Sequence, residues 1–305
     1  MRVFVTGATG FIGSAIIPEL IKAGHQVLGL TRSDAGAHSL VAAGAGVHRG
    51  SLEDPESLRS GAAQSEGVIH CAFDHSAFGN DFSKFAEVCD KDRRSIEALG
   101  DALRGSDRPL VITSGTGMGN AVPGHPATED HFDPNHPNPR RLSEVAGAAV
   151  SERGVNVSVV RLPQVHDTVK QGLITYAIHV AREKGASAYI GEGLNRWPAA
   201  HVLDVARLYR LALERHEAGS RYNAAAEEGV SMREIAEVIG RGLKVPVVSL
   251  SQQEAQPHFG WLSMFVSYDM PASSAQTSRR LGWRPTGPGL IADLEQMSWP
   301  ESVTR

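Results

Sequence analysis

Three glycines near the N-terminus have the spacing of a phosphate-binding turn. Gly7, Gly10 and Gly13 follow the apolar run 3–5 and open an amphipathic stretch over residues 11–23. In such a unit the first glycine allows a tight turn, the second lets backbone N–H groups approach a phosphate, and the third lets the helix pack closely on the strand. The N-terminus of that helix would face the anion with its unpaired N–H groups and its positive dipole end. We therefore expect a site for the pyrophosphate of NAD or NADP, rather than a purely structural glycine turn.

The end of the second expected strand, residues 27–30, bears on which dinucleotide binds. NAD sites place an Asp or Glu there to accept hydrogen bonds from the ribose, whereas a basic residue neutralises the 2′-phosphate of NADP. This chain has Thr31, Arg32 and Ser33 at that point, and Asp34 comes only afterwards. A guanidinium and a hydroxyl are both good phosphate donors. We expect NADP, with NAD as the alternative cofactor; the competing interpretation of Arg32 is a solvated surface arginine.

The elements that must position these residues alternate between strands and helices. Strand-like runs cover 3–5, 27–30, 47–51, 68–72, 110–114 and 155–162, and the helical stretches between them include 11–23, 55–62, 81–104 and 144–153. This alternation predicts an α/β fold, a doubly wound parallel sheet of the Rossmann type over residues 1–168. Ligands of such sheets bind beyond the carboxyl ends of the strands. The other residues expected at the cofactor lie there: Thr9, Phe11, Ile12, Ser51, Leu52, Ala72, Phe73, Pro163 and His166.

Residues 169–305 do not continue this simple alternation. We expect a helix over 169–184, a strand over 186–190, a glycine turn, a helix over 202–217, a strand over 245–250 and a last helix near 289–297. Ser231 and Ser251 each precede a Glu by three residues, the spacing of a capping box at a helix start. This half is expected to form mainly a smaller C-terminal α/β lobe that binds the substrate. Trp197 and His201 are candidates to line the site, although core packing explains the tryptophan equally well.

Composition bounds the class of protein. The chain has 305 residues, 41% of them hydrophobic, and a net charge of −4. There is no basic footprint for nucleic acid, and no apolar segment long enough for a signal peptide or a membrane span. Cys71 and Cys89 lack the spacing of a metal site or a redox pair. We expect a cytoplasmic protein that takes a small-molecule substrate, without metal, membrane or nucleic-acid partners; its oligomeric state is open, with a homodimer as one option.

Five motifs spread over essentially the whole chain point to one family. They are Gly7-x-x-Gly10-x-x-Gly13, Val68-Ile69-His70-Cys71-Ala72, Ile112-Thr113-Ser114-Gly115, Arg161-Leu162-Pro163 and His201-Val202-x-Asp204-Val205-Ala206. Together they resemble an extended short-chain dehydrogenase/reductase of the NAD-dependent epimerase/dehydratase type. The resemblance implies a Rossmann domain, hydride transfer at the nicotinamide C4, and a catalytic Ser, Tyr and Lys, the last two in a Tyr-x-x-x-Lys motif. Ser114 matches the family serine that hydrogen-bonds the substrate oxygen.

The chain departs from the family at the catalytic pair, because it contains no Tyr-x-x-x-Lys motif. With Glu144 and Arg161 aligned to the Glu and Arg that flank the pair in the family, the lysine position falls on Arg140 and the tyrosine position on His136. A histidine titrates near neutrality and could donate the proton without the help of a lysine. Arg140 could hold ribose hydroxyls or polarise the site, but it cannot accept a proton. The competing interpretation of His136 is a solvated loop histidine.

Two classes of function remain open from the sequence. The first is an NADP-dependent oxidoreductase that transfers a hydride between the nicotinamide and a small carbonyl or alcohol, with the proton coming from Ser114, His136 or water. The second is a non-catalytic NADP-binding sensor or interaction module. Ser114 favours the enzyme, and the missing pair favours the module. We expect the enzyme, but not a sugar-nucleotide epimerase or dehydratase, since those reactions depend on the tyrosine base.

Overall fold

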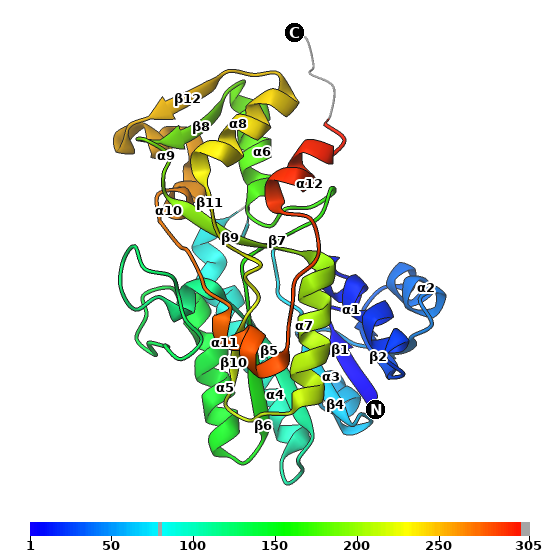
Figure 1. The fold of residues 1–305 in the computed structure, drawn as a ribbon. Helices are drawn as coiled ribbons and strands as arrows, with labels where there is room; N and C mark the ends of the chain where they lie inside the picture. The colour runs from blue at the N-terminus through cyan, green and yellow to red at the C-terminus, as the bar shows by residue number, and fades with distance from the viewer. Residues whose placement is uncertain (79–80, 300–305) are drawn as a thin grey trace.

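The computed structural model describes residues 1–78 and 81–299, which form a lower and an upper lobe in the view of Figure 1. The strands of the lower lobe are β1 (Arg2–Thr6), β2 (Gln26–Thr31), β3 (Gly46–Arg49), β4 (Gly67–His70), β5 (Pro109–Gly115), β6 (Asn156–Leu162) and β10 (Arg221–Asn223). They pair in parallel in the order β10-β6-β5-β4-β1-β2-β3. The strand order therefore reverses between β1 and β4, where ligands of doubly wound sheets bind. The expected fold class is confirmed.

Helices cover both faces of this sheet. One face carries α1 (Phe11–Lys22), α2 (Asp34–Ala42) and α7 (Val202–Arg215), and the other carries α3 (Pro55–Ala63), α4 (Phe85–Leu103) and α5 (Leu142–Glu152). Successive side chains of a strand point to opposite faces. Accordingly Val3 and Val5 pack under α1 and α7, while Phe4 packs under α3 and α4. The helix α7 and the strand β10 come from the second half of the chain, as does α11 (Ala275–Leu281), which contacts β10.

The upper lobe contains two small sheets and several helices. Its strands are β7 (Gln164–His166), β8 (Ser187–Ile190), β9 (Arg196–His201), β11 (Glu227–Ser231) and β12 (Val247–Leu250). They pair in the orders β11-β9-β7 and β12-β8. The helices are α6 (Ile174–Lys184), α8 (Met232–Leu243), α9 (Gln252–Phe259), α10 (Ser263–Val266) and α12 (Leu290–Gln296). Capping boxes start α8 at Ser231 and α9 at Ser251, as the spacing predicted.

Two expectations for the upper lobe differ from the structure. The helix expected over 169–184 begins only at Ile174, because the carboxylate of Asp167 accepts hydrogen bonds from the N–H groups of Val169 and Lys170 at 2.6 and 2.7 Å, and Gly172 has a φ of +59°. The glycine turn expected after residue 190 leads into the strand β9. Within β9 the side chain of Trp197 is fully buried in the core of the upper lobe, so core packing explains it.

Four single-turn 3-10 segments connect these elements: η1 (Phe82–Lys84), η2 (Thr116–Gly119), η3 (Pro139–Arg141) and η4 (Gly260–Leu262). No helix among residues 1–78 and 81–299 is long and apolar enough to cross a membrane. Over the same described residues, no group of three or more His, Cys, Asp or Glu side chains is arranged to hold a metal ion. Both cysteines are free thiols, and burial raises the pKa of each to about 12.

Candidate active site

The glycine turn between β1 and α1 has the geometry that a pyrophosphate site requires. Gly7 has a φ of +69°, and a Cβ on it would lie 2.7 Å from the N atom of Ala72. A Cβ on Gly13 would lie 2.0 Å from the carbonyl oxygen of Gly7. Packing therefore requires glycine at both positions.

Gly10 is different, and its surroundings fit a bound phosphate. Its φ of −80° suits any residue, and a Cβ there would meet only the Gly7 oxygen, at 3.1 Å. Gly10 is also the N-cap of α1, and no side chain caps the helix. The first-turn N–H groups, which include those of Phe11 and Ile12, therefore have no capping side chain and lie at the positive end of the helix dipole. The residues present thus fit the dinucleotide that the sequence predicted.

The other residues predicted at the cofactor lie at the same edge of the sheet, but several have structural partners. The N–H of Ala72 donates to the hydroxyl of Thr6 at 3.3 Å. The hydroxyl of Ser51 accepts from the N–H of Glu53 at 3.3 Å, within the turn after β3. Leu52, Phe73 and Pro163 are half-buried, and Thr9 lies in the glycine turn. Their cofactor contacts remain predictions.

Arg32 extends from the end of β2 as an exposed side chain. Within residues 1–78 and 81–299 its guanidinium has no hydrogen bond or ion pair, whereas the nearby carboxylate of Asp34 is bound to Arg49 at 2.5 Å. The hydroxyl of Ser33 accepts from the N–H of Gly36 and caps α2. The tip of β2 thus offers an uncommitted positive charge and no free carboxylate.

Ser114 carries a buried hydroxyl without a partner. Its side chain is 2% exposed, and its Oγ has no hydrogen-bond partner in the described protein. The hydroxyl of the preceding residue, Thr113, has two hydrogen-bond partners. It donates to the carbonyl of His70 at 2.7 Å, and it lies 2.6 Å from the Tyr209 hydroxyl. A buried polar group without a partner is costly, and a catalytic or ligand-binding role is one explanation for keeping it. The substrate contact that the family resemblance implies for Ser114 remains a prediction.

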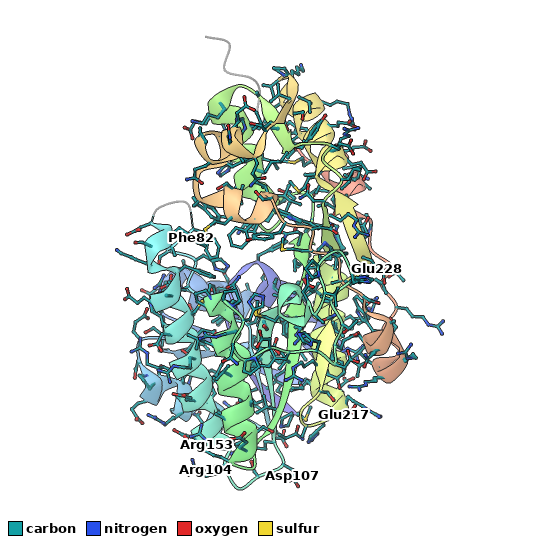
Figure 2. All side chains as sticks on the ribbon, turned by 90° about the vertical axis from the view of Figure 1, so that its left-hand side faces the viewer. Phe82, Arg104, Asp107, Arg153, Glu217 and Glu228 are labelled. Carbon is teal, nitrogen blue, oxygen red and sulfur yellow. The ribbon has the colours of Figure 1, made fainter. Side chains whose placement is uncertain are left out.

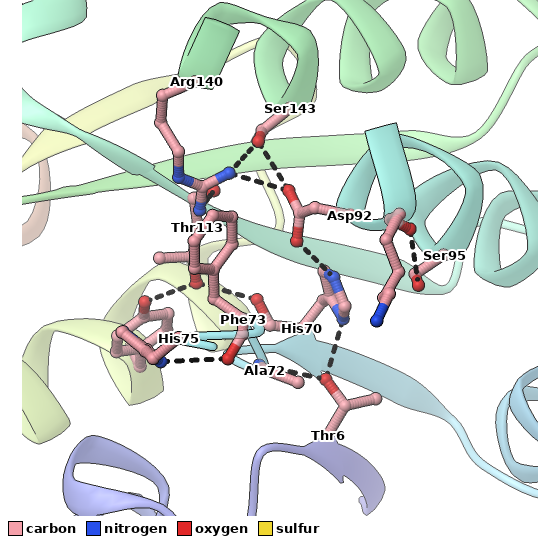
Figure 3. Close-up of polar contacts among 12 residues, drawn as sticks. Thr6, His70, Ala72, Phe73, His75, Asp92, Ser95, Thr113, Arg140 and Ser143 are labelled. Carbon is pink, nitrogen blue, oxygen red and sulfur yellow. Dashed lines mark hydrogen bonds and ion pairs between the residues drawn. The ribbon is translucent and has the colours of Figure 1, made fainter. Parts of the chain in front are cut away.

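A buried polar network lies behind this strand end, with Asp92 of α4 at its centre (Figure 3). The two oxygens of Asp92 accept from Nε2 of His70 at 3.0 Å, from the hydroxyl of Ser143 at 2.5 Å and from Nη1 of Arg140 at 2.7 Å. The other nitrogen of His70, Nδ1, lies 2.7 Å from the hydroxyl of Thr6. Burial alone would raise the pKa of Asp92, but the charge of Arg140 and these hydrogen bonds lower it to about 2. Asp92 is therefore a carboxylate at neutral pH.

The spacing of buried residues along α4 already indicates that Asp92 is buried. Val88, Cys89, Ser95, Ile96 and Leu99 are buried and have helical spacing, and Asp92 falls on the same face. A carboxylate at a core position of an amphipathic helix requires a buried partner. That partner, Arg140, is far away in the sequence and could not be named from the periodicity.

Arg140, at the position of the family lysine, is held in place by several groups. Besides Asp92 it donates to the hydroxyl of Ser143 and, through Nη2, to the carbonyl of Thr113 at 2.9 Å. Its guanidinium carbon lies 4.2 Å from the centre of the Phe73 ring. The guanidinium therefore contacts both the strand that carries Ser114 and the loop after β4.

Glu144 and Arg161, whose alignment to the family placed Arg140 and His136, contact each other in the core. Nε and Nη2 of Arg161 donate to the two carboxylate oxygens of Glu144 at 2.8 and 2.9 Å, and neither side chain is exposed. Arg161 also donates to the carbonyls of Thr128 and His131. It thereby fastens the long loop after β5, which leads to His136.

His136 is half-buried, and its Nδ1 accepts a hydrogen bond from the N–H of Asn138 at 3.1 Å. Because an acceptor nitrogen carries no proton, the neutral ring is protonated on Nε2. A charged His136 would bring two donors face to face and lose the bond to Asn138. His136 therefore offers Nε2 as its hydrogen-bond donor, and its part in proton transfer remains a prediction.

His166 is fully buried beneath α12, where its Nδ1 lies 2.7 Å from the carboxylate of Asp293. Its Nε2 has no partner among the described residues. Burial lowers the pKa of His166, although Asp293 opposes that shift. A contact between this residue and the cofactor remains a prediction. Asp204 pairs with Arg207 at 2.6 Å and accepts a hydrogen bond from the N–H of Gly287, so its carboxylate has structural partners.

Aromatic rings from the loop after β4 contact the upper lobe beside this site (Figure 2). Phe78 lies 5.5 Å from Trp261 between ring centres and 6.2 Å from Tyr176. Phe82 stacks on Trp261 at 5.2 Å and meets Phe265 at 5.9 Å. Tyr176 thus packs among these rings, and the edge of the site nearest the upper lobe is lined by aromatic side chains.

Two residues that the sequence analysis did not single out also lie at this edge. Lys170 of the upper lobe places its Nζ 5.9 Å from the centre of the Phe11 ring, at the start of α1. His75 follows Phe73 in the loop after β4 and hydrogen-bonds to it. Both residues lie in loops, where no periodic pattern of apolar residues indicates which side chains face the site. The sequence therefore did not indicate either residue.

Comparison with known proteins agrees with this geometry. The model of the "NAD dependent epimerase/dehydratase family" matches residues 3–225. The chain is 49% identical over 295 residues to an uncharacterized protein of Schizosaccharomyces pombe, covering 96% of this chain and 98% of the relative. It is 26% identical over 335 residues to a UDP-glucose 4-epimerase of Streptomyces lividans, covering 99% and 96%. The fold is similar to that of DesIV, a dTDP-glucose 4,6-dehydratase of Streptomyces venezuelae with NAD and TYD bound, with a TM-score of 0.76, 18% identity and coverage of 97% and 95%.

Proposed function

We propose a function on the premise that this chain belongs to the NAD dependent epimerase/dehydratase family and is an NAD(P)-dependent enzyme of it. The proposal is an NADP-dependent oxidoreductase that reduces a small carbonyl compound, or oxidises the corresponding alcohol. The lower lobe would bind the cofactor and the upper lobe most of the substrate. The reduced nicotinamide, when bound, supplies a hydride to the carbonyl carbon.

The unpartnered hydroxyl of Ser114 carries this proposal. It is buried at the carboxyl end of β5, two strands from the glycine turn at the end of β1. A hydroxyl held there can donate to a substrate oxygen on which negative charge develops, and it breaks no existing bond to do so. His136, whose Nδ1 accepts from Asn138, would offer its Nε2 as a second donor to that oxygen.

The uncommitted charge of Arg32 supports NADP over NAD. Its guanidinium would bind the 2′-phosphate, and no free carboxylate at the tip of β2 opposes that contact. His136 and Arg140, at the positions of the family tyrosine and lysine, favour carbonyl reduction over the epimerisation or dehydration of a sugar nucleotide. An epimerase or dehydratase needs a strong base, and neither an arginine nor a histidine whose Nδ1 is already an acceptor reproduces a tyrosinate.

Ser114→Ala tests this function, measured by NADPH oxidation over a panel of short aliphatic and aromatic aldehydes and ketones. We expect the wild type to turn over part of the panel and Ser114→Ala to lose about 10–10³-fold in kcat, with unchanged NADPH affinity. Removing an unpartnered buried hydroxyl should leave the thermal stability unchanged or higher.

The matched control is Ser106→Ala, whose hydroxyl donates to the carbonyl of Leu103 at the opposite edge of the sheet. We expect this variant to keep wild-type turnover. Absence of wild-type turnover over the whole panel, despite tight NADP binding, would contradict the proposed function. Full activity in Ser114→Ala would show that the Ser114 hydroxyl does not take part in the proposed reaction.

A further inference from the structure

We propose that His75 is the acid–base residue of this site and handles the proton that the missing tyrosine would transfer. The inference rests on the proposed oxidoreductase function. His75 lies in the loop after β4, at the point where the strand order reverses. Figure 3 shows it with Phe73, next to the network that holds Arg140.

Neighbouring groups fix the position of the His75 ring. Its Nδ1 donates to the carbonyl of Phe73 at 3.0 Å, and its centre lies 5.5 Å from the Phe73 ring and 5.7 Å from the Phe78 ring. The loop itself is held by Asp74, which accepts from Lys91 at 2.6 Å and from the N–H of Ser76 at 2.9 Å. The ring is therefore oriented before any ligand binds, as a catalytic group should be.

The hydrogen bond from Nδ1 to the Phe73 carbonyl leaves Nε2 of His75 available for proton transfer. A carbonyl oxygen only accepts, so Nδ1 of His75 carries a proton in both the neutral and the charged ring. All gain and loss of protons then occurs at Nε2, and the residue keeps an exposed edge. Proton transfer at Nε2 changes no other bond of the ring. His136 differs in this respect, because protonating its Nδ1 would break the bond to Asn138.

The surrounding groups favour the neutral form of the His75 ring, so carbonyl reduction, which needs the charged ring, should be fastest below neutral pH. Burial lowers the pKa of His75 below its usual 6.5, the bond to the Phe73 carbonyl opposes that shift, and the charge of Arg140 adds to it. Asp74 and Lys170 act in opposite directions and are the other charged groups that face the ring.

The proton transfer balances with NADPH, the carbonyl compound and one proton from solvent as the reactants. As the carbonyl carbon is reduced, its oxygen takes the proton from Nε2 of His75, so that the N–H bond breaks and an O–H bond forms. The N–H electron pair stays on the ring, which becomes neutral. Solvent at the exposed edge then returns a proton to Nε2. In alcohol oxidation the neutral ring accepts the proton instead.

The first test needs no turnover. The NMR titration of the His75 ring is followed in the cofactor-free protein and assigned with His75→Gln, which lacks that signal. We expect a midpoint below 6.5, the usual value for histidine, and a change of the signal when NADP+ is added. The control is His38, an exposed histidine on α2, whose signal should keep its position. A His75 signal that does not respond to NADP+ would overturn the proposal.

The second test measures carbonyl reduction by His75→Gln with the same panel. Glutamine can donate a hydrogen bond but cannot titrate, so kcat should fall about 10²–10⁴-fold while NADPH affinity stays the same. Wild-type kcat should fall as pH rises through the His75 pKa, and this dependence should vanish in the variant. His38→Gln should behave as the wild type. Wild-type rate and pH profile in His75→Gln would overturn the role of His75 alone, whereas a wild type inactive on the whole panel would overturn the proposed function as well.

Discussion

At the scale of single residues, replacing a lysine with an arginine changes what the site can hold. A lysine ammonium is a compact charge, whereas the guanidinium of Arg140 presents a planar fork of donors. That fork reaches the Asp92 carboxylate, the Ser143 hydroxyl and the Thr113 carbonyl at once. Such a side chain stiffens the strand end behind Ser114, but it neither accepts a proton nor lowers the pKa of a tyrosine that is not there.

Arg32 gives the sharpest prediction at this scale. Because its guanidinium has no partner among the described residues and should bind the 2′-phosphate, the wild type should bind NADP+ more tightly than NAD+ in calorimetry. Arg32→Asp should reverse the preference. Loss of one charge-assisted contact, about 1.5–3 kcal/mol, corresponds to a ten- to hundredfold weaker binding of NADP+.

A matched charge reversal controls for long-range electrostatics. Arg104 lies at the opposite end of the lower lobe (Figure 2), and Arg104→Asp should leave both affinities unchanged. Equal affinities of the wild type for the two cofactors would show that Arg32 is an ordinary surface arginine.

At the scale of elements, α4 acts as a support for the site rather than as a surface helix. It contributes Asp92, whose carboxylate is 2% exposed and balances Arg140, which is 14% exposed. Breaking a buried ion pair by removing one partner leaves an uncompensated charge in the interior. The helix and the edge of the site are therefore coupled through one carboxylate.

Asp92→Asn tests that coupling. We expect the free energy of unfolding to fall by about 3–5 kcal/mol in denaturant titrations, since Arg140 stays charged without a counter-ion. Asp90→Asn is the matched control on the same helix: its carboxylate is 43% exposed and pairs with Arg93 and Arg94, so its loss should cost about 1 kcal/mol or less. Similar losses in the two variants would refute the special role of Asp92.

The pair of Asp92 and Arg140 also makes the stability of the folded protein depend on pH under acidic conditions. The pKa of Asp92 is about 2 in the folded protein and near the usual 3.8 in the unfolded chain. A lowered folded pKa adds stability above the unfolded value, and this stability is lost as pH falls from about 4 towards 2. Asp92→Asn should lack that part of the acid dependence, whereas Asp90→Asn should keep it.

At the scale of the whole molecule, the two lobes are joined by chain crossings and by aromatic contacts. The chain passes from β6 into the upper lobe at β7, returns as α7 and β10, and leaves again at β11. Phe78 and Phe82 of the loop after β4 pack against Trp261 of the upper lobe. A ligand at the carboxyl edge of the sheet therefore lies where both lobes meet.

Cofactor binding should accordingly stabilise the whole chain. At a hundredfold excess over Kd, NADP+ adds about 2.7 kcal/mol, which should raise Tm by several degrees in thermal unfolding. Gly10→Val should fold, because φ at that position is ordinary, but it should lose the NADP+-dependent rise since the side chain fills the phosphate space. Gly10→Ala, a smaller change, should give an intermediate rise. A full rise in Gly10→Val would show that the glycine turn does not bind the pyrophosphate.

The sequence by itself determined the features that are local in the chain. The spacing of Gly7, Gly10 and Gly13, the alternation of strands and helices, and the two capping boxes are patterns among residues that are close in the chain. They could therefore be recognised without the fold. The position of Ser114 at a strand end was equally readable. The start of α6 was not, because the side chain of Asp167 competes for the N–H groups that the helix would have used.

Only the tertiary structure decided which groups surround Ser114. Asp92 meets His70 across 22 residues and Arg140 across 48, and the protonation pattern of His75 depends on which carbonyl its ring faces. Periodicity shows that a residue is buried or exposed, but it does not name the partner. Contacts between distant segments are set by how the sheet brings its strand ends together, and there the chemistry of this site is determined.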